Sequence, residues 1–101
     1  MGYGNLAKMA QQMQAEMARA ETELQGLRLE GSAGGGAVTA TVTGKLDLVG
    51  VVISPEVVDP EDVEMLQDLV TAAVADALAK ARKAGEERMA RVTGGLRLPG
   101  M

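Results

Sequence analysis

Hydrophobic residues recur every three or four positions over residues 5–27, and polar residues occupy most positions between them. The hydrophobic positions are Leu6, Met9, Met13, Met17, Ala20, Leu24 and Leu27. This spacing predicts an amphipathic helix with Asn5 as its N-cap and a narrow apolar stripe similar to a coiled-coil seam. Because a lone amphipathic helix is stabilised mainly by packing, the stripe requires a partner helix.

Strand-like patterns fill the middle of the chain, where β-branched residues are frequent and apolar and polar positions alternate. The three predicted strands are residues 27–30, 37–43 and 46–53. Gly31–Gly36 predicts a flexible connection between the first two strands, and Thr43–Lys45 predicts a tight hairpin turn after the second. Gly50, inside the third segment, indicates a bulge or a close backbone approach. Together these segments predict a three-stranded antiparallel meander.

The start of a second helix is marked by capping residues. Asp59 is placed to cap this helix, and Pro60 to occupy its first position. Glu61 and Asp62 follow, near the positive end of the helix dipole. The apolar stripe of the helix is Val63, Leu66, Val70, Ala73, Ala77 and Ala81. Gly85 lowers the helix propensity by roughly 1 kcal/mol relative to Ala, so a bend or a break near this residue stays open.

The order of these elements predicts an α+β fold, with an α-β-β-β-α subunit, a three-stranded antiparallel sheet and long projecting helices. The length of 101 residues fits one domain over residues 1–93, followed by a flexible C-terminal tail over residues 94–101. Tyr3 is the only aromatic residue, so the core is aliphatic. A three-stranded meander is near the minimum for independent stability and has two open edges, so we expect a homodimer joined by its strands. The candidate interface residues, which alternate along one strand, are Val49, Val51 and Ile53.

The composition argues against most catalytic chemistry. The chain has no Cys and no His, which removes thiolates, the usual zinc ligand and the usual general base near neutral pH. Ser32 and Ser54 therefore have no His to activate them. We expect no enzyme activity, no catalytic residue, no cofactor, no bound metal and no small-molecule substrate. Because no apolar run approaches the roughly 18 residues of a membrane span, we expect a cytoplasmic protein without a membrane partner.

Two local clusters have alternative interpretations. Gly34–Gly36 invites a phosphate-loop interpretation, but the chain lacks both GxxxxGK[ST] and GxGxxG, so a simple loop is favoured. An acidic cluster also invites interpretation as a divalent-cation site, although it lacks the ligand spacing of a calcium loop. Capping of the second helix is favoured for this cluster. Its members are Asp59, Glu61, Asp62 and Glu64.

Charge is distributed unevenly along the chain, although the net charge is only −4. Residues 46–79 hold eight acidic residues and no Lys or Arg, whereas residues 80–101 hold six basic residues and two acidic ones. A locally basic surface attracts a polyanion even on an acidic protein, because charges act over about a Debye length of roughly 8–10 Å. The alternative is a solvated helix end whose bases complement the helix dipole. The candidate DNA-binding residues on this helix are Lys80, Arg82, Lys83, Arg88 and Arg91.

Several stretches distributed over nearly the whole chain resemble one known family. They are Gly4–Met9 with Gln12–Gln14, Pro55–Val70, Ala72–Ala77, and Thr93–Leu96 with Leu98–Gly100. The chain resembles the YbaB/EbfC family of bacterial nucleoid-associated proteins. This resemblance implies a tweezer-like homodimer located in the nucleoid, whose projecting helical arms bind DNA without catalysis. Lys8 and Arg19, the bases of the first helix, complete the candidate DNA contacts.

Two functions follow from these patterns. The first is a homodimeric protein that binds double-stranded DNA with little sequence preference and organises DNA or modulates gene expression. Binding to single strands is not favoured, because it usually requires aromatic stacking platforms. The alternative is a protein-binding adaptor whose Met-lined helical arms hold a partner. The Met residues of that stripe are Met9, Met13 and Met17.

Overall fold

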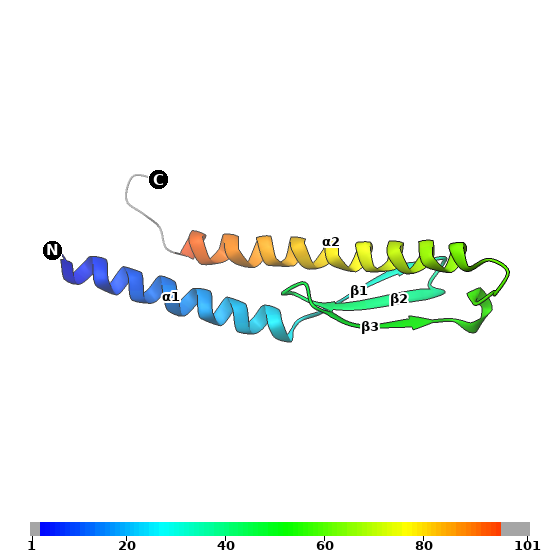
Figure 1. Cartoon of the computed structure of the whole chain (residues 1–101). Coiled ribbons are helices and arrows are strands. Elements are labelled where there is room, and N and C mark those ends of the chain that lie inside the picture. The colour runs from blue at the N-terminus through cyan, green and yellow to red at the C-terminus, as the bar shows by residue number, and fades with distance from the viewer. Residues whose placement is uncertain (1–2, 96–101) are drawn as a thin grey trace.

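The computed structural model describes residues 3–95, which fold into two long helices and a small sheet (Figure 1). The elements are α1 (Tyr3–Gly26), β1 (Arg28–Ala33), β2 (Val38–Thr43), β3 (Leu48–Ile53), a short 3-10 helix (Pro55–Val57) and α2 (Val63–Gly95). This order confirms the predicted α-β-β-β-α fold. The described part of the chain is elongated, with extents of 71 × 23 × 16 Å. Residues 94 and 95, which were assigned to the predicted tail, are the last residues of α2, and the rest of that tail lies outside the described residues.

The sheet is an antiparallel meander with the strand order β1-β2-β3, as the alternating pattern predicts. Val38 on the central strand lies opposite Ala33 of β1 and Ile53 of β3. The register shifts within the β2–β3 pair, where Thr41 lies opposite Gly50 and the next residue of β2 lies opposite Leu48. The predicted bulge beside Gly50 is therefore confirmed, and the extra residue is Val49.

Both connections between the strands differ from the prediction. The first three residues of the segment Gly31–Gly36 belong to β1, where they pair with β2, and Gly31 lies close to the backbone of α2. The turn begins only at Gly34, whose positive φ of 64° suits a residue without a side chain. The β2–β3 connection comprises residues 44–47 rather than a tight turn. The Thr43 hydroxyl stabilises it by accepting hydrogen bonds from the backbone N–H groups of two residues of this loop.

The predicted helix boundaries are also corrected. Asn5 lies inside α1, which includes Tyr3, so it does not cap this helix. The Asp59 carboxylate accepts a hydrogen bond from the Glu61 N–H and thus caps an isolated turn before α2. Asp62 instead caps α2, because its carboxylate accepts a hydrogen bond from the Met65 N–H at 3.1 Å. The helix continues without a break through the glycine at position 85.

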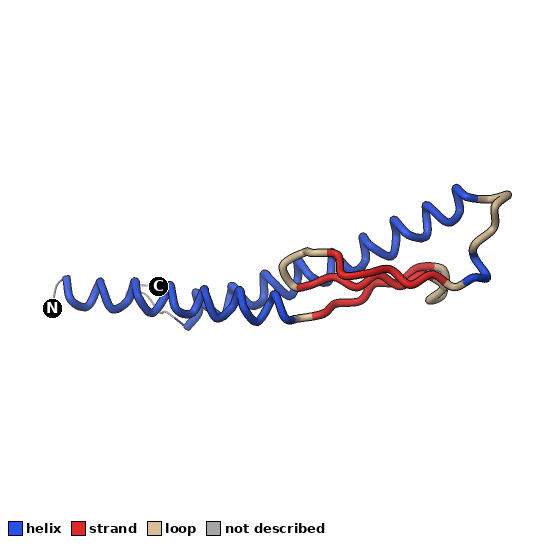
Figure 2. The backbone as a smooth tube through the Cα atoms, turned by 60° about the horizontal axis from the view of Figure 1, so that its bottom comes forward, coloured by secondary structure: helices blue, strands red, loops and turns tan. Residues whose placement is uncertain are grey.

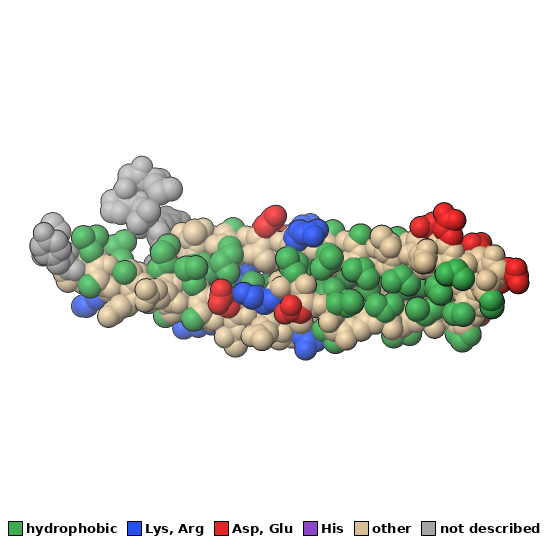
Figure 3. Space-filling view, in the orientation of Figure 1, with side chains coloured by type: hydrophobic (Ala, Val, Ile, Leu, Met, Phe, Trp, Pro, Cys, Tyr) green, Lys and Arg blue, Asp and Glu red, His purple; other side chains and the backbone are tan. Residues whose placement is uncertain are grey.

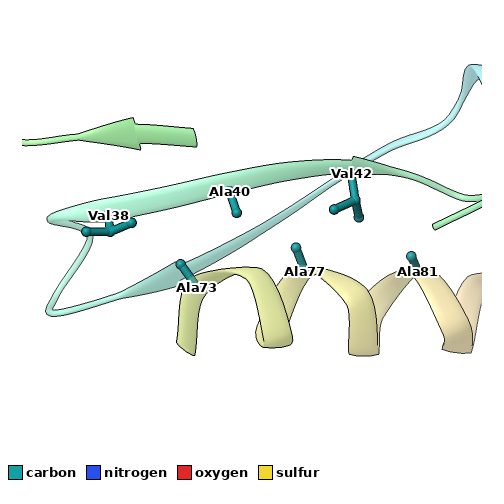
Figure 4. Packing of buried hydrophobic residues seen from close by; sticks show 6 residues of the cluster. All are labelled: Val38, Ala40, Val42, Ala73, Ala77 and Ala81. Atoms are coloured by element: carbon teal, nitrogen blue, oxygen red, sulfur yellow. The ribbon is translucent and has the colours of Figure 1, made fainter. Parts of the chain in front are cut away.

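The core lies between α2 and the side of β2 that faces this helix. Figure 4 shows the side chains of β2 directed at a row of Ala residues on α2. The fully buried side chains of this cluster are Val38, Ala40, Val42, Ala73, Ala77 and Ala81. Small residues allow the helix and the strands to approach closely, but only two of these six side chains are larger than Ala. The core is therefore thin.

α2 packs on β1 and β2, whereas the apolar side chains of β3 continue beyond the helix. Figure 2 shows the sheet on one side of α2, and Figure 3 shows hydrophobic side chains in a band over the sheet half of the molecule. The exposed apolar residues from the β2–β3 connection to the first residue of α2 include Leu46, Leu48, Ile53, Val58 and Val63. We call this group the apolar band. Acidic side chains lie at its end, where α2 begins (Figure 3).

Candidate nucleic-acid interface

α1 and the C-terminal half of α2 lie side by side and extend beyond the sheet (Figure 1). We call this helix pair the arm. Ala20 and Leu24 of α1 and Val92 of α2 are buried in it. The arm is also fixed to the sheet, because the Gly44 N–H donates hydrogen bonds to the carbonyl oxygens of Leu24 and Leu27 at 2.8 and 3.2 Å. These bonds satisfy carbonyls at the end of α1 that have no partner within the helix.

The basic residues of α2 are divided between two flanks of the helix. Successive residues of an α-helix are rotated by about 100°, which places Lys83 about 60° and Arg91 about 20° from Lys80. Arg82 is rotated by about 160° from Lys80 and lies on the opposite flank. These four residues therefore do not share one face of α2. We call the surface formed by Lys80, Lys83 and Arg91 the basic flank.

The surroundings of these residues agree with this division. Lys80 donates a hydrogen bond to the carbonyl oxygen of Glu30 at 2.9 Å, so the basic flank begins beside β1. Arg82 instead lines an apolar groove of about 360 Å³ between α2 and the β2–β3 connection, together with Leu46 and Met89.

Three of the predicted DNA contacts are engaged in ion pairs. The Lys80 ammonium lies 3.4 Å from the Asp76 carboxylate. The Arg88 guanidinium lies 2.6 Å from the Glu23 carboxylate and joins α2 to α1. Arg19 pairs with Glu16 on α1, also at 2.6 Å. The predicted contacts that form no ion pair within residues 3–95 are Lys8, Arg82, Lys83 and Arg91.

These contacts shift the pKa values of three groups. The hydrogen bond from Arg88 lowers the pKa of Glu23 below its ordinary value, and it raises the pKa of Arg88. The backbone N–H of Ser32 donates a hydrogen bond to Asp76 at 3.1 Å and lowers the pKa of this carboxyl group, with a further contribution from Lys80. All three groups are therefore charged near neutral pH. The i,i+4 spacing of Asp76 and Lys80 indicates their pairing, but no spacing indicates the pairing of Glu23 with Arg88, which lie 65 positions apart.

The predicted interface residues of β3 have different positions in the sheet. Val51 and Ile53 lie opposite Ala40 and Val38, on the side that faces α2. Val49 is the unpaired residue of the bulge, so the three residues do not form one regular alternation. Val51 is half-buried and packs against the core, whereas the side chains of Val49 and Ile53 are exposed.

The described residues contain neither a candidate metal site nor a candidate membrane-spanning helix. Within residues 3–95, no group of three or more His, Cys, Asp or Glu side chains is arranged to hold a metal ion. Two members of the acidic cluster, Asp59 and Asp62, accept hydrogen bonds from backbone N–H groups at and before the start of α2. Neither of the two long helices, as far as they are described, is long and apolar enough to cross a membrane.

The fold and the arm place the chain in a class of α+β proteins in which two helices extend together from a three-stranded sheet. A solved structure of an uncharacterized Helicobacter pylori protein has this fold, with a TM-score of 0.69 and 24% sequence identity over 95% of this chain and 97% of that one. Residues 1–96 match the YbaB/EbfC DNA-binding family. The chain belongs to this family, which confirms the resemblance seen in the sequence.

Relatives in two other bacteria are similar over nearly their whole length. A nucleoid-associated protein of Acetivibrio thermocellus is 52% identical over 105 residues, which cover 99% of this chain and 93% of that protein. A nucleoid-associated protein of Chloroflexus aurantiacus is 50% identical over 97 residues, which cover 96% of this chain and 97% of that protein. The family is defined by DNA binding and not by a catalytic activity.

Proposed function

We propose that the protein is a homodimeric, nucleoid-associated protein of the bacterial cytoplasm that binds double-stranded DNA through the basic flank of each arm. The observation that carries this proposal is that Lys83 and Arg91, which form no ion pair within residues 3–95, lie on one flank of α2 in a chain of a DNA-binding family. Their Cα atoms are separated by about 12 Å along the helix axis. Both side chains are exposed, so both can approach phosphate groups without a change in the backbone.

Phosphate contacts account for the expected binding mode. Contacts to phosphates position a protein on the duplex but carry no sequence information, so we propose little sequence preference. Tyr3 is the only aromatic residue of the chain, which argues against the base stacking used by single-strand binders. Arg82 lies on the opposite flank, and we propose that it does not contact the same duplex. Lys8, which is exposed on α1, is the next candidate if the basic flank is not used.

A homodimer follows from the thin core and the apolar band. Monomers rarely expose large contiguous apolar patches, and a second copy of the band offers a matching apolar surface. We propose that the interface includes Val51 and Ile53, on the side of β3 that faces α2. The opposite side of the sheet carries Glu30, Ser32 and Thr39 and suits solvent.

The dimer is tested by light scattering coupled to gel filtration, which should give twice the chain mass of 10.4 kDa. Val51→Asp places a charge among apolar side chains and should yield monomers or a less stable fold. Val52→Asp is the matched control, because Val52 is 73% exposed and lies opposite Thr39, on the polar side of the sheet. A wild-type monomer at micromolar concentration, or equal effects of the two substitutions, would refute this interface.

DNA binding is tested by fluorescence anisotropy with duplexes of several sequences and with a single strand of equal length. We expect similar affinities for all duplexes, and weaker binding of the single strand. Lys80 of the basic flank is paired with Asp76, so each arm offers Lys83 and Arg91, and the two arms of a dimer make four phosphate contacts. The slope of log affinity against log salt concentration is then about −3.6, from about 0.9 per phosphate. A strong preference for one duplex would show that the arms contact nucleobases and not only phosphates, which would contradict the proposed binding mode.

One further expectation belongs to this proposal. Without His or Cys in the chain, we propose that the protein cleaves no DNA, and incubation of a plasmid with the protein and magnesium tests this.

One observation supports the alternative adaptor function, because Met13 and Met17 are 39% and 44% exposed on the arm. If Met13→Gln with Met17→Gln abolishes capture of a protein partner but leaves DNA affinity unchanged, the adaptor function gains support.

A further inference from the structure

The junction between α1 and α2 contains a groove of about 570 Å³ that the proposed DNA contacts do not explain. Leu24 and Leu27 line it from the α1 side, and Ala84 and Ala90 line it from α2. Its charged lining includes Glu23 and Arg88, which form the ion pair between the two helices. This ion pair therefore lies within the contact that holds the arm together.

Arg88 is poorly placed to contact a phosphate. Its side chain is only 12% exposed, whereas that of Glu23 is 52% exposed. The Arg88 Nε donates a hydrogen bond to a Glu23 carboxylate oxygen at 2.6 Å. A phosphate would have to displace this carboxylate, and the displaced Glu23 would then lie next to the DNA and repel it.

Glu23 also attracts Arg91, which follows Arg88 by one turn of α2. Arg91 lines the same groove as Glu23 and, after Arg88, contributes to the lowered pKa of this carboxyl group. Both Arg88 and Arg91 line the groove, but Arg91 is exposed and belongs to the basic flank, whereas the Arg88 side chain is mostly buried. The carboxylate of Glu23 thus holds Arg88 in the junction and attracts a neighbouring base that stays accessible.

We infer that Arg88 is a positioning residue that does not touch DNA. With Glu23 it joins the C-terminal half of α2 to α1, and so fixes the direction in which the arm presents Lys83 and Arg91 to DNA. This inference rests on the proposed function. It assigns to Arg88 a role different from the phosphate contact predicted from the sequence, and it assigns a role to an acidic residue in a DNA-binding arm.

Charge exchange tests this inference in the intact protein. Arg88→Glu alone and Glu23→Arg alone each place like charges together and should weaken duplex binding, while the double exchange should restore it to within about twofold. If Arg88 instead contacts a phosphate, a Glu at position 88 repels DNA in the double exchange as well. Failure of the double exchange to restore affinity, with its fold intact by circular dichroism, would overturn the inference.

Substitutions of Arg88 that do not reverse its charge give a second test. In these variants, the dependence of DNA affinity on salt distinguishes a positioning role of Arg88 from a phosphate contact. Arg88→Met should weaken duplex binding by about two- to fivefold, the range expected for loss of an ion pair in which one partner, Glu23, is exposed to solvent, with the slope unchanged. Arg88→Lys should restore most of the affinity. Loss of a phosphate contact from both arms would instead lower the magnitude of the slope by about 1.8, which would overturn the inference. Lys83→Gln serves as a reference, because an unchanged slope in that variant would refute the proposed function itself, whatever Arg88 does.

Discussion

Gly31→Ala should be strongly destabilising, because Gly31 lies where β1 approaches α2 most closely. A Cβ atom at this position would lie 2.1 Å from the backbone nitrogen of Ala77 and 2.4 Å from the backbone oxygen of Ala73. Both neighbours are backbone atoms of a helix, so no change of side-chain rotamer relieves the overlap. Either the strand or the helix has to move.

The size of the effect follows from these distances. An ordinary contact distance of 3.4 Å requires a displacement of about 1.3 Å between β1 and α2. That displacement also separates the small side chains that form the core, such as Ala40 and Ala77. An overpacked core typically costs about 1–3 kcal/mol, and we expect the upper end of this range because the core is thin. A loss of about 3 kcal/mol is a large share of the usual 5–15 kcal/mol of total stability.

Urea unfolding at one fixed protein concentration measures this effect, because the stability of a dimer depends on concentration. Gly85→Ala is the matched control, since the nearest atom to its Cβ outside α2 is the Gly44 oxygen at 3.9 Å. In the middle of a helix this substitution should stabilise the protein by up to about 1 kcal/mol. The reasoning is refuted if Gly31→Ala unfolds at the wild-type urea concentration, or if both substitutions shift the midpoint in the same direction.

Two further predictions concern polar contacts. Thr43→Val should lower the free energy of unfolding by about 1–3 kcal/mol, because the buried Thr43 hydroxyl accepts hydrogen bonds from the N–H groups of Lys45 and Asp47. Urea unfolding measures this loss, and a variant of wild-type stability would contradict it. Asp76→Asn should lower the stability at pH 7, because the hydrogen bond from Ser32 lowers the pKa of the Asp76 carboxyl group and favours its charged form in the folded state. That contribution is present above the ordinary pKa of 3.8 and is lost as the pH falls through the lower pKa of the folded state. The stability difference between wild type and variant should therefore shrink below pH 3.8, whereas a constant difference from pH 7 to pH 2 would contradict this assignment.

The order of elements could be predicted from the sequence because local patterns determine it. Periods of two and of three to four residues distinguish the strands from the helices, and Gly50 marks the bulge. The start of α2 could not be predicted, because Asp59 and Asp62 are equally able to cap a helix. The structure uses Asp59 for an isolated turn and Asp62 for the helix. The continuity of α2 through Gly85 could not be predicted either. Glycine has a low helix propensity, and the packing of the helix, which outweighs this propensity, is not visible in the sequence.

The candidate site was only partly predictable for the same reason. The sequence indicated a basic end of the second helix, and the helical period explains why Lys83 and Arg91 share a flank while Arg82 does not. Whether a Lys or Arg side chain is free or engaged in an ion pair also depends on contacts between different helices and strands. The pairing of Arg88 with Glu23 requires α1 and α2 to lie side by side, and no spacing within either helix encodes it.

The most direct test of the account compares two adjacent bases on opposite flanks of α2. Lys83→Gln and Arg82→Gln each remove one positive charge from neighbouring exposed positions, so their effects on net charge are equal. Duplex affinity is measured by fluorescence anisotropy at several salt concentrations for wild type and both variants. We predict that Lys83→Gln weakens binding and changes the slope from about −3.6 to about −1.8, while Arg82→Gln leaves the slope near its wild-type value. Equal slopes for the two variants, or a larger change with Arg82→Gln, would contradict the claim that the basic flank binds DNA.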